Sequence, residues 1–163
     1  MSGEPMLVEI LLRMIPEEAI RVGVSVPDWR AAIRACGEAM VEAGIVDMPY
    51  IDQMIAAIEE LGPYIVIAPG IALAHARPSP AVRRLGLAII VLDSPVPFGH
   101  PENDPVRLII GLAAPDPHSH VQVLAVMAEM LSEESCRFAL FHAATPSDVR
   151  RALVKFSQRG SCA

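Results

Sequence analysis

Long apolar runs are missing from this sequence, although hydrophobic residues occupy 53% of its 163 positions. The most apolar stretches, residues 85–92 and 108–114, fall far short of the ~20 residues that cross a bilayer. We therefore expect no membrane insertion, and we interpret both stretches as central strands buried on both faces. No basic segment followed by an apolar run stands at the start, so we also expect no secretory signal.

Cysteines, basic clusters and aromatic residues are scarce as well. The three cysteines, Cys36, Cys136 and Cys162, form no CxxC pair, which indicates free thiols in a reducing, cytoplasmic compartment. The net charge is −6 and aromatic residues make up 4% of the chain, whereas nucleic-acid binders carry clustered Lys and Arg. We expect no nucleic-acid partner.

Several motifs of common enzyme classes are absent. The sequence has no GxSxG for a serine hydrolase, no GxxxxGK[ST] for a P-loop and no GxGxxG for a dinucleotide. It also has neither HExxH nor the cysteine spacing of a zinc site. The sequence therefore predicts no cofactor and no metal.

Apolar periodicity instead predicts helices interspersed with strands. Strands are expected at residues 19–26, 64–68, 85–92 and 106–114. Helices are expected after Asp28, at Pro49, and after Asp116, Ser132 and Thr145. This pattern indicates an α/β fold with a mixed, mostly parallel sheet and helices on both faces. A single domain is expected over residues 1–163, with its core at about 6–156 and a frayed C-terminal tail.

The stretch PGIALAHARPSP, residues 69–80, follows a predicted strand. Its prolines favour an irregular, stiff loop, and ligand sites gather just beyond strand ends in α/β sheets. His75 lies in its middle between two alanines that leave room for a partner. Arg77 adds a fork of donors suited to an oxyanion. An ordinary solvated loop histidine is the alternative.

His120 stands at the start of the helix that Asp116 is predicted to cap. Free backbone N–H groups at such a start bind anions, so a neutral imidazole there could face the same anion. The inward face of this helix is predicted to carry Val121, Leu124, Ala125, Ala128 and Leu131. A plain helix-start histidine is one alternative for His120. A metal site with His118 and His75 is the other, although helical residues i and i+2 point apart.

Two histidines, an arginine and a helix start suit a phosphoryl group that arrives on another protein. His142, near a predicted helix end, is interpreted as structural. The segment GHPENDP, residues 99–105, either rims the site with His100 and Asn103 or simply connects two strands.

Three patterns in the chain resemble one known family. They are the PGIA-x-x-HARP loop, the segment GH-x-x-NDPV and the helix start D-x-x-x-H. Together they resemble the EIIA component of the bacterial sugar phosphotransferase system, of the mannitol/fructose type and most closely of the ascorbate type. The resemblance covers roughly residues 6–156.

The resemblance implies a cytoplasmic phosphocarrier, which is a phosphotransferase component. In this interpretation His75 accepts a phosphoryl group through Nε2 from phospho-HPr and passes it to a cysteine of EIIB, which serves the membrane permease EIIC. His120 matches the family's second active-site histidine, which stabilises the phosphoryl group. We expect an exposed apolar rim near His75 for docking. Formation of a homodimer is left as an alternative to a monomer.

One departure from the family pattern concerns the residue before the active histidine. The family's loop usually has proline there, whereas this chain has Ala74. Alanine is expected to loosen the backbone by about 0.4–1 kcal/mol through the unfolded chain. This leaves open a second function, a regulatory module that signals by its phosphorylation state and by protein binding without sugar transport.

Overall fold

A five-stranded mixed sheet runs through residues 13–159, the part of the chain that the computed structural model describes. The strands, in the order β1-β4-β5-β3-β2, are β1 Ile20–Val24, β2 Val66–Ala68, β3 Ile71–Ala74, β4 Gly86–Val96 and β5 Val106–Ala113. β1 pairs parallel with β4, as β3 does with β5, whereas β4–β5 and β2–β3 are antiparallel. Parallel and antiparallel pairings are equally frequent among these described strands. The expected mixed α/β sheet is confirmed.

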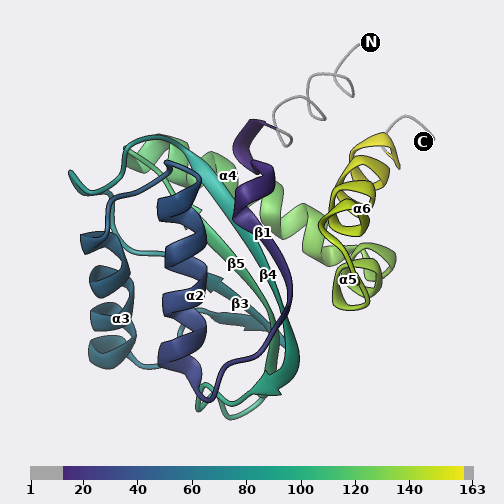
Figure 1. Cartoon of the computed structure of the whole chain (residues 1–163), viewed down its shortest axis with the longest axis horizontal. Helices are drawn as coiled ribbons and strands as arrows, with labels where there is room; N and C mark the ends of the chain where they lie inside the picture. The colour runs from purple at the N-terminus through teal and green to yellow at the C-terminus, as the bar shows by residue number, and fades with distance from the viewer. Residues whose placement is uncertain (1–12, 160–163) are drawn as a thin grey trace.

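Helices cover both faces of the sheet (Figure 1). One face carries α2 (Trp29–Glu42) and α3 (Pro49–Leu61). The other face carries α4 (Pro117–Ser132), α5 (Glu134–Phe141) and α6 (Pro146–Arg159). A short 3-10 helix, η1 (Glu17–Ala19), leads into β1. The prediction of a single α/β domain with helices on both faces is confirmed.

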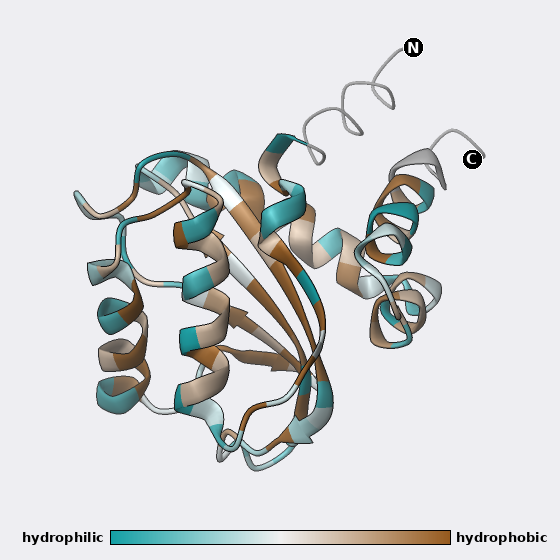
Figure 2. Ribbon diagram, viewed as in Figure 1, coloured by the Kyte–Doolittle hydropathy of each residue, from teal (hydrophilic) through white to brown (hydrophobic). Residues whose placement is uncertain are grey.

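The central strands are buried on both sides, and their side chains alternate between two apolar cores. Ile89 of β4 packs toward α4–α6, whereas its neighbours Ala88 and Ile90 pack toward α2 and α3. This period-two alternation is what a pleated strand between two helical layers requires. Figure 2 shows the apolar strands enclosed by helices. The interpretation of residues 85–92 and 108–114 as central strands buried on both faces is confirmed.

A strand that the sequence did not predict precedes His75. The expectation of an irregular loop over residues 69–80 is wrong for Ile71–Ala74, which forms β3 with all four residues buried. Pro69 and Gly70 form the turn of the β2–β3 hairpin, where Gly70 has a φ of 77° that glycine adopts without steric cost. The run is short and its parallel partner β5 is distant in sequence, so no local pattern marks it.

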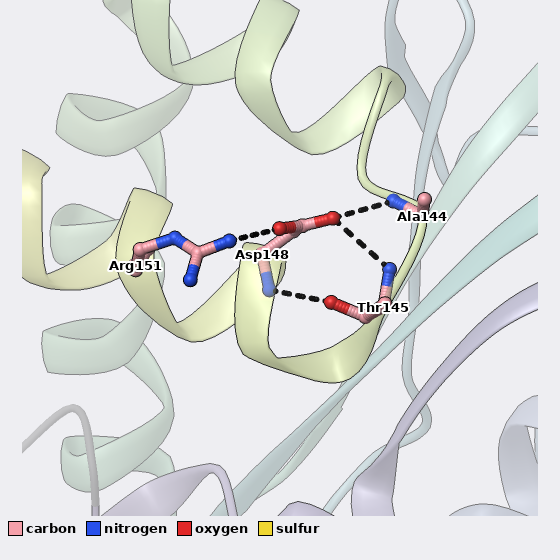
Figure 3. A network of polar contacts seen from close by, with 4 residues as sticks. All are labelled: Ala144, Thr145, Asp148 and Arg151. Atoms are coloured by element: carbon pink, nitrogen blue, oxygen red, sulfur yellow. Dashed lines mark hydrogen bonds and ion pairs between the residues drawn. The ribbon is translucent and has the colours of Figure 1, made fainter.

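Capping side chains determine where two of the helices begin. Asp28 accepts the N–H of Ala31 at 2.9 Å, as predicted for α2. At α6, the N–H of Asp148 donates to Thr145 Oγ1 at 3.1 Å, and the Asp148 carboxylate accepts the N–H groups of Thr145 and Ala144 (Figure 3). This reciprocal arrangement is the predicted capping box.

The cap predicted at Ser132 is wrong. Ser132 is the last residue of α4, and its hydroxyl donates to the carbonyl of Glu129 at 2.7 Å. It therefore closes one helix instead of opening the next.

The inward face of α4 also differs from the predicted one. The structure buries Val123, Met127, Met130 and Leu131, whereas Val121 is 64% exposed. α4 carries apolar residues on most of its circumference, so its periodicity admits more than one inward face. Packing against the sheet selects among them.

Cys36 and Cys136 are both buried, as predicted. Burial raises the pKa of Cys36 to about 12, although the Arg21 charge opposes this rise. The predicted core start at residue 6, the end of the frayed tail and the thiol of Cys162 lie outside the described residues. Within residues 13–159, no helix is both long and apolar enough to cross a membrane.

Candidate functional site

The carboxyl ends of β3 and β5 meet at one edge of the sheet because the two strands run parallel, with Ala74 paired to Gly111. His75 directly follows β3, and α4, which carries His120, begins after a short link from β5. Strand ends that share an edge bring together residues from distant parts of the chain. The topology therefore places both predicted histidines at the same edge.

His75 and His120 lie side by side there. Their ring centroids are 5.4 Å apart, with an angle of 64° between the ring planes. Both rings line a pocket of about 370 Å³ whose other walls are mainly apolar. Leu61 and Val121 on its rim are 62% and 64% exposed. The pocket is thus an open apolar surface around two imidazoles.

The hydrogen bond of His75 fixes the tautomer of its ring. Nδ1 lies 2.8 Å from the carbonyl oxygen of Leu73, and a carbonyl oxygen only accepts, so Nδ1 carries the proton in this contact. Burial lowers the pKa of His75 below its ordinary value; the Leu73 hydrogen bond opposes this shift and the charge of His120 adds to it. A neutral ring with its proton on Nδ1 keeps the lone pair of Nε2 available as a nucleophile.

The start of α4 does not provide the free N–H groups that the sequence suggested. Asp116 Oδ1 accepts the N–H of Ser119 at 2.8 Å, and the Asp116 carbonyl accepts the N–H of His120 at 3.1 Å. Pro117, the first helical residue, has no N–H. The Ser119 contacts lower the pKa of Asp116, so a carboxylate already occupies this helix start. The expected anion site on the backbone is therefore wrong, and the His120 side chain is the group left facing His75.

Arg77 lies on the rim of the same pocket and is exposed. Its charge acts on Tyr64, where it opposes the rise in pKa that burial produces. The Tyr64 ring stands edge-on to His75, with centroids 5.6 Å apart at 81°. This ring shields one side of the imidazole from water.

Sequence reasoning missed both tyrosines that the chain contains. Tyr64 packs on His75, and the hydroxyl of Tyr50 contacts the backbone of Ala76, the next residue. Aromatic residues make up only 4% of the chain, and this rarity was the one sequence signal that could have drawn attention to the two tyrosines. Neither position stood out, because Tyr50 is on a helix remote in sequence and Tyr64 precedes a short strand.

His100 and Asn103 do not rim this site. The carbonyl of Asn103 accepts the N–H of Gly70 at 2.9 Å, and Gly70 precedes β3 whereas His75 follows it. The four residues of β3 separate the two ends by about 13 Å. His100 Nδ1 accepts the N–H groups of Glu102 and Asn103, so it organises the connection between β4 and β5. The structure favours the alternative, a strand connection at the opposite end of the sheet.

The remaining histidines stand apart from this pair. His142 ends α5, where its Nδ1 lies 2.9 Å from the carbonyl of Phe138 and its ring stacks on the Phe138 ring. His118 is exposed on α4. Over residues 13–159, no group of three or more His, Cys, Asp or Glu side chains could hold a metal ion.

Comparison with known families gives a match over residues 13–155. The matching family is the phosphoenolpyruvate-dependent sugar phosphotransferase system, EIIA 2. Among characterised relatives, the chain is 33% identical over 121 residues to the ascorbate-specific PTS system EIIA component of Escherichia coli K12. That alignment covers 74% of this chain and 79% of the relative.

Two solved structures share the fold. The mannitol-specific cryptic phosphotransferase enzyme IIA from Escherichia coli superposes with a TM-score of 0.80 at 29% identity, over 89% of this chain and 98% of that one. A complex of enzyme IIA for mannitol with phosphorylated enzyme IIB, from the same organism, gives 0.74 at 29% identity, over 85% and 95%.

Proposed function

Because the chain belongs to the phosphoenolpyruvate-dependent sugar phosphotransferase system EIIA 2 family, we propose that it is a cytoplasmic phosphocarrier that uses His75. It takes a phosphoryl group from phospho-HPr and passes it to a cysteine of an EIIB component, which serves the EIIC permease. The ascorbate-specific relatives support the ascorbate type. The solved IIA–IIB complex of the mannitol system supports an EIIB partner.

One observation carries the proposal: the Nδ1 of the half-buried His75 is bound to Leu73 while its ring faces His120 in an open pocket. In the forward step, a P–N bond forms at Nε2 of His75 while the P–N bond to the donor histidine breaks. The Nδ1 proton stays on the ring, where the Leu73 carbonyl stabilises the positive charge that develops. Such transfer depends on positioning and charge stabilisation, and it needs no cofactor.

His120 and Arg77 are the groups proposed to face the transferred phosphoryl oxygens. His120 lies against the acceptor ring, and its imidazole can donate a hydrogen bond to an oxygen. Arg77 carries a permanent charge on the rim. We expect His120→Ala to slow transfer about a hundredfold, the order of loss seen when one stabilising donor is removed.

The test is phosphorylation in vitro. Incubation with phosphoenolpyruvate, enzyme I and HPr is expected to add the mass of one phosphoryl group, in an acid-labile and alkali-stable form. His75→Ala is expected to abolish this label. His142→Ala, which removes an imidazole outside the pocket, is the matched control and keeps it. Labelling of His75→Ala at the wild-type level would refute the assignment.

A second step separates transport from regulation. Adding the EIIB domain encoded beside a permease gene is expected to drain the label from His75 onto the EIIB cysteine. A label that stays on His75 would instead support the regulatory module.

A further inference from the structure

The hydroxyl of Tyr50 lies between the two segments that carry the histidines. Tyr50 is near the start of α3 and is fully buried. Its Oη is 3.0 Å from the N–H nitrogen of Ala76 and 2.9 Å from the carbonyl oxygen of Leu112, and the Ala76 carbonyl is 3.2 Å away. One side chain therefore contacts the residue after His75 and the end of β5.

These contacts use the hydroxyl both as an acceptor and as a donor. The N–H of Ala76 donates to Oη, and the single O–H proton is donated to Leu112, with the Ala76 carbonyl as a second, longer acceptor. Burial raises the pKa of Tyr50 to about 12. The hydroxyl thus stays protonated, and able to donate, throughout the neutral range.

The contact matters because the pairing between β3 and β5 stops just before it. The β3–β5 register ends with Ala74 opposite Gly111, so Ala76 and Leu112 lie beyond the last pair. From Ala76 the backbone leads back to His75, and from Leu112 it leads through a short link to α4 and His120. Tyr50 bridges the two segments where the ladder between β3 and β5 no longer does.

We propose that Tyr50 is a positioning residue whose buried hydroxyl holds His75 at its distance from His120 during phosphoryl transfer. This inference rests on the proposed function, since it assigns Tyr50 a role in that same site. Tyr50 acts through the backbone of Ala76 and does not line the pocket, so it sets geometry and not docking. The competing role is core packing by its ring alone.

Tyr50→Phe separates these roles because it keeps the ring and removes only the hydroxyl. We expect the rate constant at saturating phospho-HPr to fall about tenfold, with the KM for phospho-HPr unchanged, because small misplacements of a reacting group cost rate. Ile58→Val, a truncation of another buried residue of α3, is the matched control for loss of stability and is expected to keep the wild-type rate.

Two measurements need no phosphoryl donor. Nuclear Overhauser contacts between the His75 and His120 rings are expected to weaken in Tyr50→Phe and to persist in Ile58→Val. In the wild-type protein, the amide of Ala76 is expected to exchange with deuterium as slowly as the amides of β3, because Oη accepts its proton.

The outcomes distinguish this inference from the proposed function. A folded Tyr50→Phe protein with the wild-type rate, or an equal loss of rate in Ile58→Val, would overturn the positioning role. Rapid exchange of the Ala76 amide would overturn it even if Tyr50→Phe failed to fold. A wild-type chain that accepts no phosphoryl group would refute the proposed phosphocarrier function. The ring contacts between His75 and His120 and the exchange of the Ala76 amide would still test the positioning role of Tyr50.

Discussion

The protonation state of one imidazole decides what the site can do. Only neutral His75 has a lone pair on Nε2, and the structure favours the neutral form by burial, while the Leu73 carbonyl keeps the remaining proton on Nδ1. Burial is the largest influence, and the Leu73 contact, which favours the charged ring, is smaller. The local environment therefore keeps Nε2 of His75, the proposed nucleophile, unprotonated at neutral pH.

This balance predicts the pH dependence of both activity and stability. Phosphoryl acceptance is expected to stay constant as the pH falls to 6.5 and to decline only below it, when the folded protein finally takes the proton. Between 6.5 and the lowered pKa of the folded state, the unfolded chain binds the proton first, so the His75 contribution lowers the free energy of unfolding as the pH falls. NMR titration of the His75 ring measures the pKa directly.

Tyr64→Ala supplies the matched comparison for this titration. Removing the ring that stands edge-on to His75 admits water to the imidazole, so the pKa of His75 should rise toward 6.5. An unchanged or lower pKa in this variant would contradict the assignment of the shift to burial.

Ala74 is held by the sheet and not by loop chemistry. It is the last residue of β3 and is fully buried. The N–H of Leu73 donates to Ile65 on the β2 side, and because successive N–H groups of a strand alternate in direction, that of Ala74 points toward β5. A proline at this position would lack the donor.

Ala74→Pro is therefore expected to lower the free energy of unfolding by about 1 kcal/mol. Proline stiffens the unfolded chain, which adds ~0.4–1 kcal/mol to the free energy of unfolding. The loss of the Ala74 N–H leaves a buried acceptor on β5 without its donor, which costs ~1–3 kcal/mol. Urea denaturation measures the difference. Ala74→Gly, which keeps the N–H, is the control for backbone flexibility. A proline variant as stable as the wild type would show that Ala74 contributes no strand hydrogen bond.

At the scale of elements, the close approach of α2 and α3 places Tyr50 over the sheet. A Cβ added at Gly37 of α2 would lie 2.4 Å from Cγ1 of Ile51, the residue after Tyr50. Real carbon atoms do not approach so closely, so only glycine lets α3 lie at this distance. A glycine in mid-helix is ordinarily unfavourable, and here the packing explains it.

Gly37→Ala tests this contact. Overpacking costs ~1–3 kcal/mol and the better helix propensity of alanine returns at most ~1 kcal/mol, so we expect net destabilisation in thermal or urea unfolding. Combined with Ile51→Ala, which removes the clashing atom, the two losses should not add. Full additivity in this double-mutant cycle would mean that the two side chains do not meet.

At the scale of the whole molecule, one sheet serves two apolar cores. Alternate residues of β4 and β5 belong to the core under α2 and α3 and to the core under α4–α6. Each helical layer thus depends on strands that the other layer also stabilises. Such a shared sheet favours unfolding in a single cooperative transition.

The chain contains probes for both layers. Its single tryptophan, Trp29, packs at the α2–α3 core, and Cys136 is buried in the α4–α6 core. In a Cys162→Ser variant, Trp29 fluorescence and labelling of Cys136 by a thiol reagent should give the same urea midpoint. Labelling of Cys136 at lower urea would show that the α4–α6 layer opens separately. Cys36, buried in the first core, reports on that layer in the same experiment.

The sequence by itself determined the type of most elements and identified the two histidines that meet. Caps at Asp28, Asp116 and Thr145 and the apolar runs of β4 and β5 are local signals, because a helix start or a doubly buried strand depends on neighbours along the chain. The small residues around His75 and the helix start before His120 are likewise local signals, and they indicated a candidate site at these two histidines.

Only the tertiary structure decided which chain segments share an edge. The sequence did not predict strand β3, because its four residues form a strand by pairing with β5, which is distant along the chain. His100 and Asn103 resembled site residues by sequence, yet the parallel register puts them at the other end of β3. Tyr50 and Tyr64 reach His75 from separate elements. Such contacts follow from strand order and from the close approach of helices, and no periodicity along the chain records either.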